Sequence, residues 1–335
     1  MLIPELSVIM PVYNAGNYLS ETIESILNQT HTGFEFIILN DNSTDNSLAI
    51  IQRYMAKDSR IILINKLQNM GPASLRNEGF GIAKGEFIAL MDADDIALPT
   101  RFQKQITLLK NNPEIGVCGT WFTFFGAKKN KIIKHSEQHD NIKVSFLNSC
   151  GIGNPTVMFR KDALFGLQFD DDYVPVEDYD LWSRLLDKTK FYNIQESLLK
   201  YRQHDANISK TKIENVNRSI RKVKISQLSA FGIETTDSKI DSYLHAVSLK
   251  KGLNPEEIIE VIKSSKLILS QNKKLGKYNE ELLEKHISKT LIRVIRNAKT
   301  NNISFYKHLK SNEKELFHKI NKLDKTILFF KSVIG

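Results

Sequence analysis

The stretch Phe87–Asp95, with the sequence FIALMDADD, decides the fold. Its first half is a short apolar run that predicts a buried strand, and three carboxylates follow at Asp92, Asp94 and Asp95. In open α/β sheets, ligand sites form just outside the carboxyl ends of the strands. The stretch therefore predicts an α/β sheet with an acidic binding site at one edge.

Three carboxylates this close repel one another, and they stay ionised together only when a cation lies among them. Hard oxygen ligands select Mg²⁺ or Mn²⁺, so we expect a divalent ion that bridges from these carboxylates to phosphate oxygens. The alternative is helix capping, because Asp is favoured before a helix and Pro99 follows soon after.

The sequence around this stretch alternates short β-branched apolar runs with helical patterns, which is typical of βαβ units and a mostly parallel sheet. The expected strands are Leu6–Met10, Phe34–Leu39, Arg60–Ile64 and Phe87–Met91. The expected helices are Tyr18–Gln29, Asp45–Met55, Pro72–Ala83 and Thr100–Lys110. Later strands are expected at Val117–Phe125, Thr156–Arg160 and Leu198–Arg202, with a short helix at Asp178–Leu186.

Length and composition indicate a globular protein. The 335 residues allow two or three domains at about 100 to 200 residues each, and 41% hydrophobic with 25% charged residues excludes wholesale disorder. The two cysteines, Cys118 and Cys150, have no metal-ligand or redox spacing, which favours a reducing cytosol. No apolar run approaches the roughly 18 to 20 residues of a spanning helix, so we expect a soluble or peripheral protein.

The charge is unevenly spread. Residues 210–335 hold 26 Lys and Arg against 13 Asp and Glu, whereas residues 1–209 hold 21 against 25. We therefore expect a catalytic domain over 1–209 and a basic, mostly helical region over 210–335. Lysine-rich amphipathic stretches ending in Thr326–Ile334 are compatible with docking on an anionic bilayer, at the inner face of the cell membrane. The alternatives are a solvated helical bundle and a homo-oligomerisation module, and we expect no nucleic-acid partner.

Two further clusters point to nucleotide binding. Asp41, within Asn40–Asp45 after the second strand, can accept hydrogen bonds from a nucleobase imide or a ribose hydroxyl. An Asx turn with a helix cap is the alternative for its neighbours. Arg76, about one turn into a predicted helix, can grip a diphosphate or a base carbonyl, or else be solvated.

Two clusters in the second half of this region can act on an acceptor or a phosphate. Glu177 and Asp178 open a predicted helix, where the dipole favours an anion and a general base can be held ionised. The alternative is ordinary helix N-terminal charge, which this cluster alone favours. Arg202 can close over phosphate, and His204 can contact a metal or diphosphate, although a lone loop His is more often solvated.

Laid in order, these pieces resemble family 2 glycosyltransferases of GT-A fold over roughly residues 5–209. The matching segments are Ser7–Asn14, Asn40–Asp45, Leu75–Asn77, Gly85–Ile88, Asp92–Asp95, Asn154–Pro155, Glu177–Trp182 and Tyr201–His204. Each segment is weak alone, but that many in this order is specific. The resemblance implies a Rossmann-like mixed sheet flanked by helices, followed here by the helical extension.

The resemblance also implies inverting transfer of a hexosyl or N-acetylhexosaminyl group from a nucleotide-sugar, commonly a UDP-sugar. The acceptor would be a hydroxyl of a glycan or lipid-linked glycan in bacterial cell-surface polysaccharide synthesis. The residues carried over to donor binding are Pro11, Tyr13, Asn14, Asp41, Arg76, Asp92, Ala93 and Arg202. Those carried over to the Mn²⁺ or Mg²⁺ ion are Asp94, Asp92 and His204, and the catalytic base is Asp178, with Glu177 beside it.

The chain departs from the family pattern at two positions. Asn40 stands where many relatives have Asp, and Asn154 where many have His. A sugar-phosphate nucleotidyltransferase is disfavoured, because the first strand leads to Pro11–Asn14 with a single Gly16 rather than to a Gly-rich phosphate loop. A non-catalytic carbohydrate- or nucleic-acid-binding module would not need carboxylates at all of these places.

Overall fold

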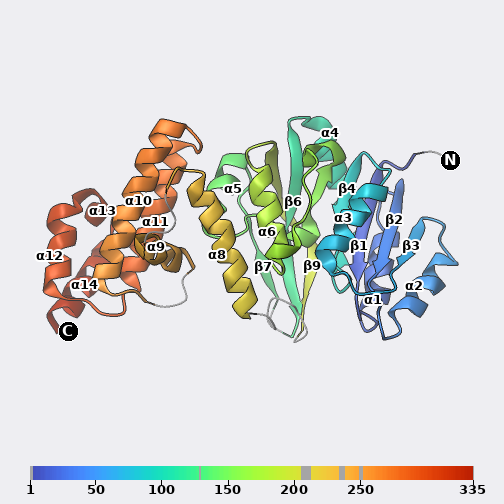
Figure 1. The fold of residues 1–335 in the computed structure, drawn as a ribbon, viewed down its shortest axis with the longest axis horizontal. Helices are drawn as coiled ribbons and strands as arrows, with labels where there is room; N and C mark the ends of the chain where they lie inside the picture. The colour runs from blue at the N-terminus through green and yellow to red at the C-terminus, as the bar shows by residue number, and fades with distance from the viewer. Residues whose placement is uncertain (1–2, 128–129, 205–212, 234–237, 249–251, 335) are drawn as a thin grey trace. The chain divides into compact units, whose positions relative to one another are not determined.

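The computed structural model describes residues 3–127, 130–204, 213–233, 238–248 and 252–334. The chain forms two compact units, one of residues 1–142 with 150–220 and the other of residues 143–149 with 221–335. The first unit is built on a β-sheet and the second from helices (Figure 1). The division falls within helix α8 (Ile213–Ser229), and the boundary predicted between residues 209 and 210 lies outside the described residues.

The first half of the sheet holds four parallel strands in the order β3-β2-β1-β4. These strands are β1 (Leu6–Val12), β2 (Phe34–Asn40), β3 (Ile61–Asn65) and β4 (Phe87–Leu90). The helices that connect them in turn are α1 (Leu19–Leu27), α2 (Ser47–Met55) and α3 (Pro72–Ile82). Because parallel neighbours cannot be joined by a tight hairpin, each connection is a helical crossover.

The second half of the sheet is mixed in direction. Strand β8 is antiparallel to both β4 and β6, and β9 runs parallel to β6 and antiparallel to β5. The strands are β5 (Ile96–Ala97), β6 (Ile115–Gly126), β7 (Lys131–Ile133), β8 (Met158–Arg160) and β9 (Lys190–Gln203). The helices are α4 (Arg101–Asn111), α5 (His139–Ser145) and α6 (Glu177–Leu185), with 3₁₀ turns at Asn154–Thr156, Lys161–Leu164 and Asp171–Tyr173.

The register of the parallel strands brings their carboxyl ends to one edge of the sheet. Val12 at the end of β1 lies beside Asn40 at the end of β2, and Ile9 lies beside Leu90 at the end of β4. The loops that begin at residues 13, 41 and 91 therefore leave the sheet along the same edge, where an open α/β sheet binds its ligands.

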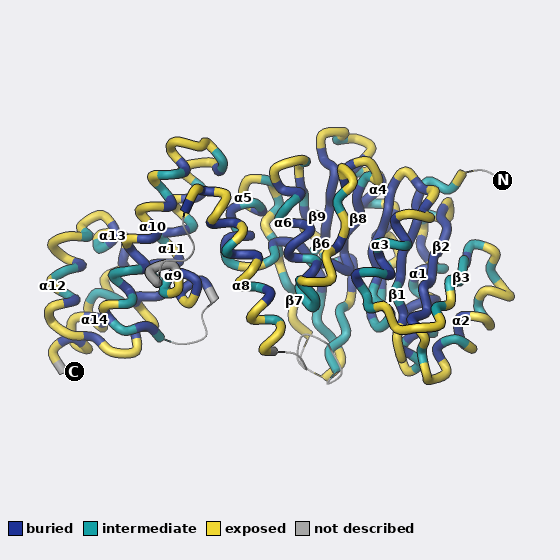
Figure 2. The backbone as a smooth tube through the Cα atoms, in the orientation of Figure 1, coloured by how far each residue is buried: buried dark blue, intermediate teal, exposed yellow. Residues whose placement is uncertain are grey.

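The central parallel strands are buried over almost their whole length (Figure 2). Crossover helices cover both faces of such strands, which explains why their sequences are continuous apolar runs rather than alternating ones. Helix α3 packs closely on β1 at Gly79. A Cβ atom there would lie 2.7 Å from Cγ2 of Ile9, so glycine permits this approach.

The predicted fold class is confirmed, but β9 is longer than predicted, and the short strands β5 and β7 are not among the predicted strands. Strand β9 begins at Lys190, well before the predicted Leu198. The exposed Gln195 and Glu196 interrupt its apolar pattern where the register with β6 shifts between Ile194 and Ser197. Strand β5 has only two residues, too few to give a periodic signal.

The second unit is helical. Besides the later part of α8, its helices are α9 (Ser238–Ser248), α10 (Pro255–Leu275), α11 (Glu280–Arg296), α12 (Ile303–Asn312), α13 (Lys314–Lys319) and α14 (Lys322–Ile334). Their ends follow local sequence signals: Asn254 and Glu257 form a reciprocal capping box before α10, and Gly276 ends that helix with a φ of 60°. Asn279 and Asn302 cap α11 and α12.

An apolar core joins these helices. It includes Ile258, Leu283 and Leu309, and also Val144 and Leu147 from the short segment 143–149 that belongs to this unit. Among the described residues, no helix is both long enough and apolar enough to cross a membrane.

Candidate active site

The loop after β1 is fastened to the loop after β2. Asn14 has a positive φ of 49°, and its Oδ1 accepts a hydrogen bond of 2.8 Å from the backbone N–H of Thr44. Its own backbone N–H donates to Oγ of Ser43 at 3.0 Å. Pro11 is half-buried near the end of β1, and Tyr13 is 54% exposed. The phenol ring of Tyr13 is therefore available to a ligand at this edge.

Asp41 is buried at the end of β2 and holds the start of α3. Its Oδ1 accepts a hydrogen bond of 2.7 Å from the backbone N–H of Met70, and its Oδ2 accepts one of 2.9 Å from that of Gly71. Gly71 has a φ of 83°, in the region that favours glycine. A carboxylate can accept about four hydrogen bonds, so each oxygen of Asp41 keeps acceptor capacity.

Arg76 on α3 joins two carboxylates that are far apart in the sequence. Its Nη1 donates to Oε1 of Glu177 and its Nη2 to Oδ1 of Asp92, each at 2.9 Å. Its guanidinium lies over the ring of Phe169, with 5.5 Å from Cζ to the ring centroid. Burial alone would lower the pKa of Arg76, but the charges of Asp92 and Glu177 raise it, so the guanidinium stays charged. Arg76 thus links the end of β4 to the start of α6.

The Asp92–Asp95 loop holds one wholly buried and two partly exposed carboxylates. The side chains of Asp92 and Asp94 are 29% and 25% exposed, and Asp95 is fully buried. Burial, followed by the charge of Asp92, raises the pKa of Asp94, and burial with both neighbours raises that of Asp95 well above its ordinary value. The carbonyl oxygen of Ala93 accepts a hydrogen bond of 3.0 Å from Oγ1 of Thr22 on α1. This bond anchors the loop between its two partly exposed acids.

The end of β9 closes over the same loop. The backbone N–H of Arg202 donates to Oδ1 of Asp95 at 2.9 Å, and its Nε donates to the carbonyl oxygen of Asp94 at 2.8 Å. Nε2 of His204 lies 2.8 Å from Oδ2 of Asp94, and its ring stacks on Tyr18 at 4.9 Å between centroids. The side chain of Arg202 thus fixes the loop backbone, and His204 reaches the carboxylate of Asp94.

The start of α6 presents a titratable carboxylate. Glu177 is buried against Arg76, whereas Asp178 is half-buried and accepts a hydrogen bond of 2.7 Å from the backbone N–H of Tyr179. Burial, followed by the charge of Glu177, raises the pKa of Asp178 to about 7, against the opposing effect of Arg76. A carboxylate that titrates near neutrality is suited to accept a proton as a general base.

Tyr201 indicates that the two acidic groups face the same place. Burial raises the pKa of its hydroxyl, and the next causes are the charges of Asp92, Asp95, Asp94 and Asp178. Carboxylates from the end of β4 and from the start of α6 therefore act on a single side chain. Hydrogen bonds connect most of the predicted residues here: Arg76 joins Asp92 to Glu177, and Arg202 and His204 both contact Asp94. Ala93 lies in the same acidic loop, and Asp178 follows Glu177. The other predicted residues, Pro11, Tyr13, Asn14 and Asp41, lie on the neighbouring loops of the same edge.

Sequence reasoning missed two supports of this site. Arg101 on α4 is fully buried, and its Nη2 donates to the carbonyl oxygen of Leu90 at 2.9 Å, directly before the acidic loop. Burial lowers the pKa of Arg101 to about 10. Asn154, which stands where many relatives have His, accepts a hydrogen bond of 3.2 Å from Nε1 of Trp182 on α6. Arg101 carries no local sequence signal, and the bond between Asn154 and Trp182 is not visible in the sequence, because both partnerships form through the tertiary fold.

The acidic loop fits a hard divalent cation. Asp92 and Asp94 offer partly exposed oxygens in one loop. Burial and then the charge of Asp92 raise the pKa of Asp94, and a bound cation would offset both effects. Over the described part of the chain, no group of three or more His, Cys, Asp or Glu side chains forms a ready-made metal cage. Mg²⁺ is usually bound by one or two carboxylates together with substrate phosphates.

Comparison with known proteins identifies the family. Residues 7–165 match the model of glycosyl transferase family 2. An uncharacterized glycosyltransferase of Methanocaldococcus jannaschii is 39% identical over 206 residues, which cover 59% of this chain and 71% of that protein. The UDP-Glc:alpha-D-GlcNAc-diphosphoundecaprenol beta-1,3-glucosyltransferase WfgD of Escherichia coli is 32% identical over 217 residues, covering 64% and 83%.

A solved structure agrees on the fold. The crystal structure of S. aureus TarS 1-349 in complex with UDP-GlcNAc superposes with a TM-score of 0.58 at 16% identity, covering 87% of this chain and 89% of that one. At this identity the likeness speaks for the fold, and the architecture is of the GT-A type. Together with the sequence relatives, it leads to one conclusion: the chain belongs to glycosyltransferase family 2 and is a glycosyltransferase.

Proposed function

We propose that this glycosyltransferase moves a hexosyl or N-acetylhexosaminyl group from a UDP-sugar to a hydroxyl of a glycan or lipid-linked glycan, with inversion at the anomeric carbon. The observation that carries the proposal is the bridge at Arg76, whose guanidinium contacts Asp92 at the end of β4 and Glu177 beside Asp178. The guanidinium of Arg76 thereby holds Asp92, which we assign to the donor side, near Glu177 and the adjacent candidate base Asp178. We assign the chemistry to residues 1–209, because every residue named for it lies there.

The nucleotide is assigned to the loops after β1 and β2. Tyr13 exposes its ring there, and Asp41 keeps acceptor capacity for a base imide or a ribose hydroxyl. Asn14 ties the two loops together, with Pro11 at their base. The choice of a UDP-sugar follows the Escherichia coli relative, whose name gives UDP-Glc as its donor.

The leaving diphosphate is assigned to the acidic loop and the end of β9. Asp94, with Asp92 and His204, would hold Mg²⁺ or Mn²⁺, and such an ion neutralises charge on phosphate oxygens. Arg76 and Arg202 add positive charge at this place. Their charge favours departure of the anionic leaving group.

Asp178 is assigned the role of base. Its carboxylate accepts the proton of the acceptor hydroxyl while the acceptor oxygen attacks the anomeric carbon on the face opposite to the leaving group. Inversion follows from this single displacement. Glu177, buried against Arg76, positions the first turn of α6 that carries Asp178.

The acceptor is assigned to the lipid-linked class. The Escherichia coli relative is named for a diphosphoundecaprenol-linked acceptor, which favours a role in cell-surface polysaccharide synthesis at the cytoplasmic face of the membrane. This step concerns the acceptor alone and does not alter the assignments at the donor.

A panel of nucleotide-sugars with an undecaprenyl-diphosphate-linked sugar acceptor tests the proposal. We expect one UDP-sugar to give Mn²⁺- or Mg²⁺-dependent release of free UDP together with the glycosylated acceptor. Formation of a nucleoside triphosphate and a sugar phosphate from a nucleotide-sugar and added pyrophosphate would point instead to a nucleotidyltransferase. No turnover of any nucleotide-sugar would contradict the transferase assignment.

The donor side is tested by the substitution Asp94→Ala. We expect it to weaken metal-dependent UDP binding at least about tenfold in calorimetry, because loss of a metal-ligand interaction commonly costs that much. Asp162→Ala is the matched control, since it removes an exposed carboxylate of a 3₁₀ turn outside the acidic loop. Equal metal-dependent binding by the two variants would remove Asp94 from the donor site.

A further inference from the structure

Helix α14 leaves an apolar face in solvent. Leu323 and Phe330 are 69% and 57% exposed, and Ile327 and Val333 are 43% and 61% exposed. We call these four residues the α14 face. Their spacings of four, three and three residues place them along one side of the helix. An apolar stripe of this length on one exposed helix is unusual for a surface meant only for water.

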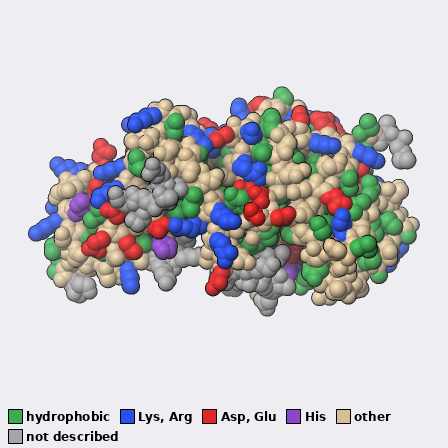
Figure 3. Space-filling view, viewed as in Figure 1, with side chains coloured by type: hydrophobic (Ala, Val, Ile, Leu, Met, Phe, Trp, Pro, Cys, Tyr) green, Lys and Arg blue, Asp and Glu red, His purple; other side chains and the backbone are tan. Residues whose placement is uncertain are grey.

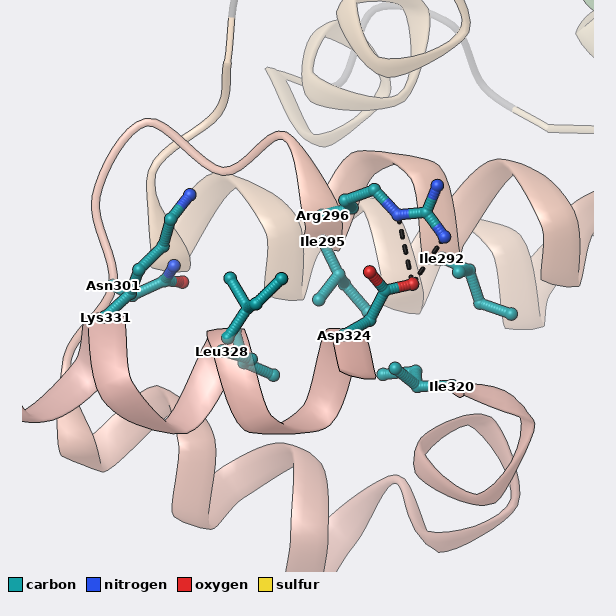
Figure 4. Close-up of a pocket in the computed structure, with 9 residues that line it drawn as sticks. Ile292, Ile295, Arg296, Asn301, Ile320, Asp324, Leu328 and Lys331 are labelled. Atoms are coloured by element: carbon teal, nitrogen blue, oxygen red, sulfur yellow. Dashed lines mark hydrogen bonds and ion pairs between the residues drawn. The ribbon is translucent and has the colours of Figure 1, made fainter. Parts of the chain in front are cut away.

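The other side of α14 is already used. Leu328 is buried in the core of the helical unit, and Figure 4 shows its side chain in a pocket with Ile292, Ile295 and Ile320. Asp324 of α14 bonds to Arg296 of α11 in the same view. Of the α14 face, Ile327 lies at the border and also lines this pocket, whereas Leu323, Phe330 and Val333 are not among the residues that line it.

The charge around this face is positive. Lys322 and Lys331 are exposed at its two ends, whereas Asp324, which is the helix's acidic residue, is engaged by Arg296. Figure 3 shows Lys and Arg side chains over the helical unit, interspersed with Asp and Glu side chains. Apolar side chains flanked by lysines are the pattern that binds an anionic membrane surface.

We propose that the α14 face docks on an anionic lipid surface, with its apolar side chains inserted at the headgroup boundary and Lys322 and Lys331 beside lipid phosphates. A two-fold contact between two copies of the chain would place these lysines near the same lysines of the partner, where like charges repel. A layer of anionic lipid offers the complementary charge. This inference does not depend on the transfer chemistry, since its readout is binding to vesicles.

Vesicle flotation of the full chain tests the proposal. We expect binding to vesicles of phosphatidylcholine with phosphatidylglycerol, at least about tenfold stronger than to phosphatidylcholine alone and weakened by salt, since screening reduces the lysine contribution. The variant Leu323→Glu/Phe330→Glu should lose at least about tenfold of this binding, because it places two anions on the face. The matched control is Leu267→Glu/Leu275→Glu on α10, whose side chains are 42% and 53% exposed.

Two further measurements distinguish a loss of membrane binding from a loss of folding and separate the lysine contribution from the apolar one. Circular dichroism should give the α14 variant and its control the same helical content, and Lys322→Gln/Lys331→Gln, which keeps the apolar residues, should weaken binding to the anionic vesicles. No binding to anionic vesicles, or equal loss in the α10 control, would overturn the proposal. A dimer in analytical ultracentrifugation that only the α14 variant abolishes would also overturn it, in favour of a second copy of this chain.

Discussion

The sheet unit and the helical unit are stabilised in different ways. The sheet unit buries many charged side chains, whereas Lys224 is the buried charged residue among the described residues of the helical unit. The buried charged residues of the sheet unit are Glu35, Asp41, Arg76, Asp95, Arg101, Glu177 and Asp180. Burying a charge costs free energy unless a partner compensates it, so these groups require the precise pairing seen at Arg76.

The helical unit depends on apolar packing and helix caps instead. Its core is formed by side chains such as Leu283 and Leu309, and its helix ends follow capping signals such as Asn254 before α10. The contrast shows where this chain accepts a cost in stability. Most of these buried charges lie at the carboxyl edge of the sheet, the place to which we assign the chemistry, whereas Glu35 lies near the start of β2 and Asp180 pairs with Arg184 within α6.

The largest expected effect is on transfer itself, through Asp178→Asn. We expect a loss of about a hundredfold or more in turnover, the scale of a general base, with UDP binding retained. In the unsubstituted protein, turnover should rise with pH through about 7, because burial and Glu177 raise the pKa of Asp178 to that value and only its ionised form accepts a proton. Steady-state assays at several pH values measure both effects.

The same substitution should affect stability in the opposite direction. The folded pKa of Asp178 lies above the ordinary 3.8, so its stabilising contribution is full below about pH 4 and is lost as the pH rises through about 7. Asn stays neutral and keeps that contribution, so Asp178→Asn should melt at a higher temperature than the unsubstituted chain at pH 8. Asp162→Asn, on an exposed carboxylate, should change neither turnover nor melting. Full turnover by the Asp178→Asn protein would contradict the assignment of Asp178 as the general base.

Much of this contrast can be seen in the sequence. The apolar runs of β1, β2 and β4 predict the parallel sheet, because strands buried on both faces need no alternation. The acids of residues 92–95 follow a strand end, and that position alone predicts a site. Local sequence patterns are sufficient wherever a residue's structural partners lie close to it in the sequence.

The pairings across the fold are not visible in the sequence. Arg76 finds Glu177 at a distance of 101 residues, and a helical arginine gives no sign of whether it is solvated or buried. The segment 143–149 belongs to the helical unit although the residues on both sides of it belong to the sheet unit. The stretch Thr326–Ile334, which the sequence offers to a bilayer as a whole, includes Leu328, whereas the structure buries this side chain in the helical unit.

The next prediction concerns the contribution of the apolar core to the stability of the helical unit. Leu283→Ala removes a fully buried side chain of α11 and should lower the free energy of unfolding of this unit by about 2 to 5 kcal/mol, through lost burial and a cavity. Leu267→Ala, at a side chain that is 42% exposed, should change it by less than about 0.5 kcal/mol. Denaturant unfolding measures both, and UDP binding by the folded Leu283→Ala protein should be unchanged because the donor residues lie in the sheet unit. A loss of UDP affinity in that variant would show that the two units are not separate in function.

The smallest expected effect is a dependence on pH that runs opposite to that of Asp178. Burial, followed by the charges of Arg293 and Lys289, lowers the pKa of His286 on α11 from 6.5 to about 4. Its contribution to stability is therefore present above about pH 6.5 and is lost as the pH falls through about 4, by roughly 2 to 3 kcal/mol at most, since one pKa unit is worth about 1.4 kcal/mol. Acid should loosen α11 while it favours the neutral form of Asp178 in the sheet unit.

Hydrogen exchange of the α11 amides between pH 6.5 and pH 4, corrected for the intrinsic pH dependence of exchange, measures this loss of protection. His286→Gln should remove most of the acid-induced loss, because the glutamine amide does not ionise. His318→Gln, at an exposed histidine of α13, should leave the loss as it is in the unsubstituted protein. If acid loosened α11 equally in all three proteins, the cause would lie in other groups of the helical unit. Its sensitivity to acid would then come from its general excess of positive charge rather than from one buried imidazole.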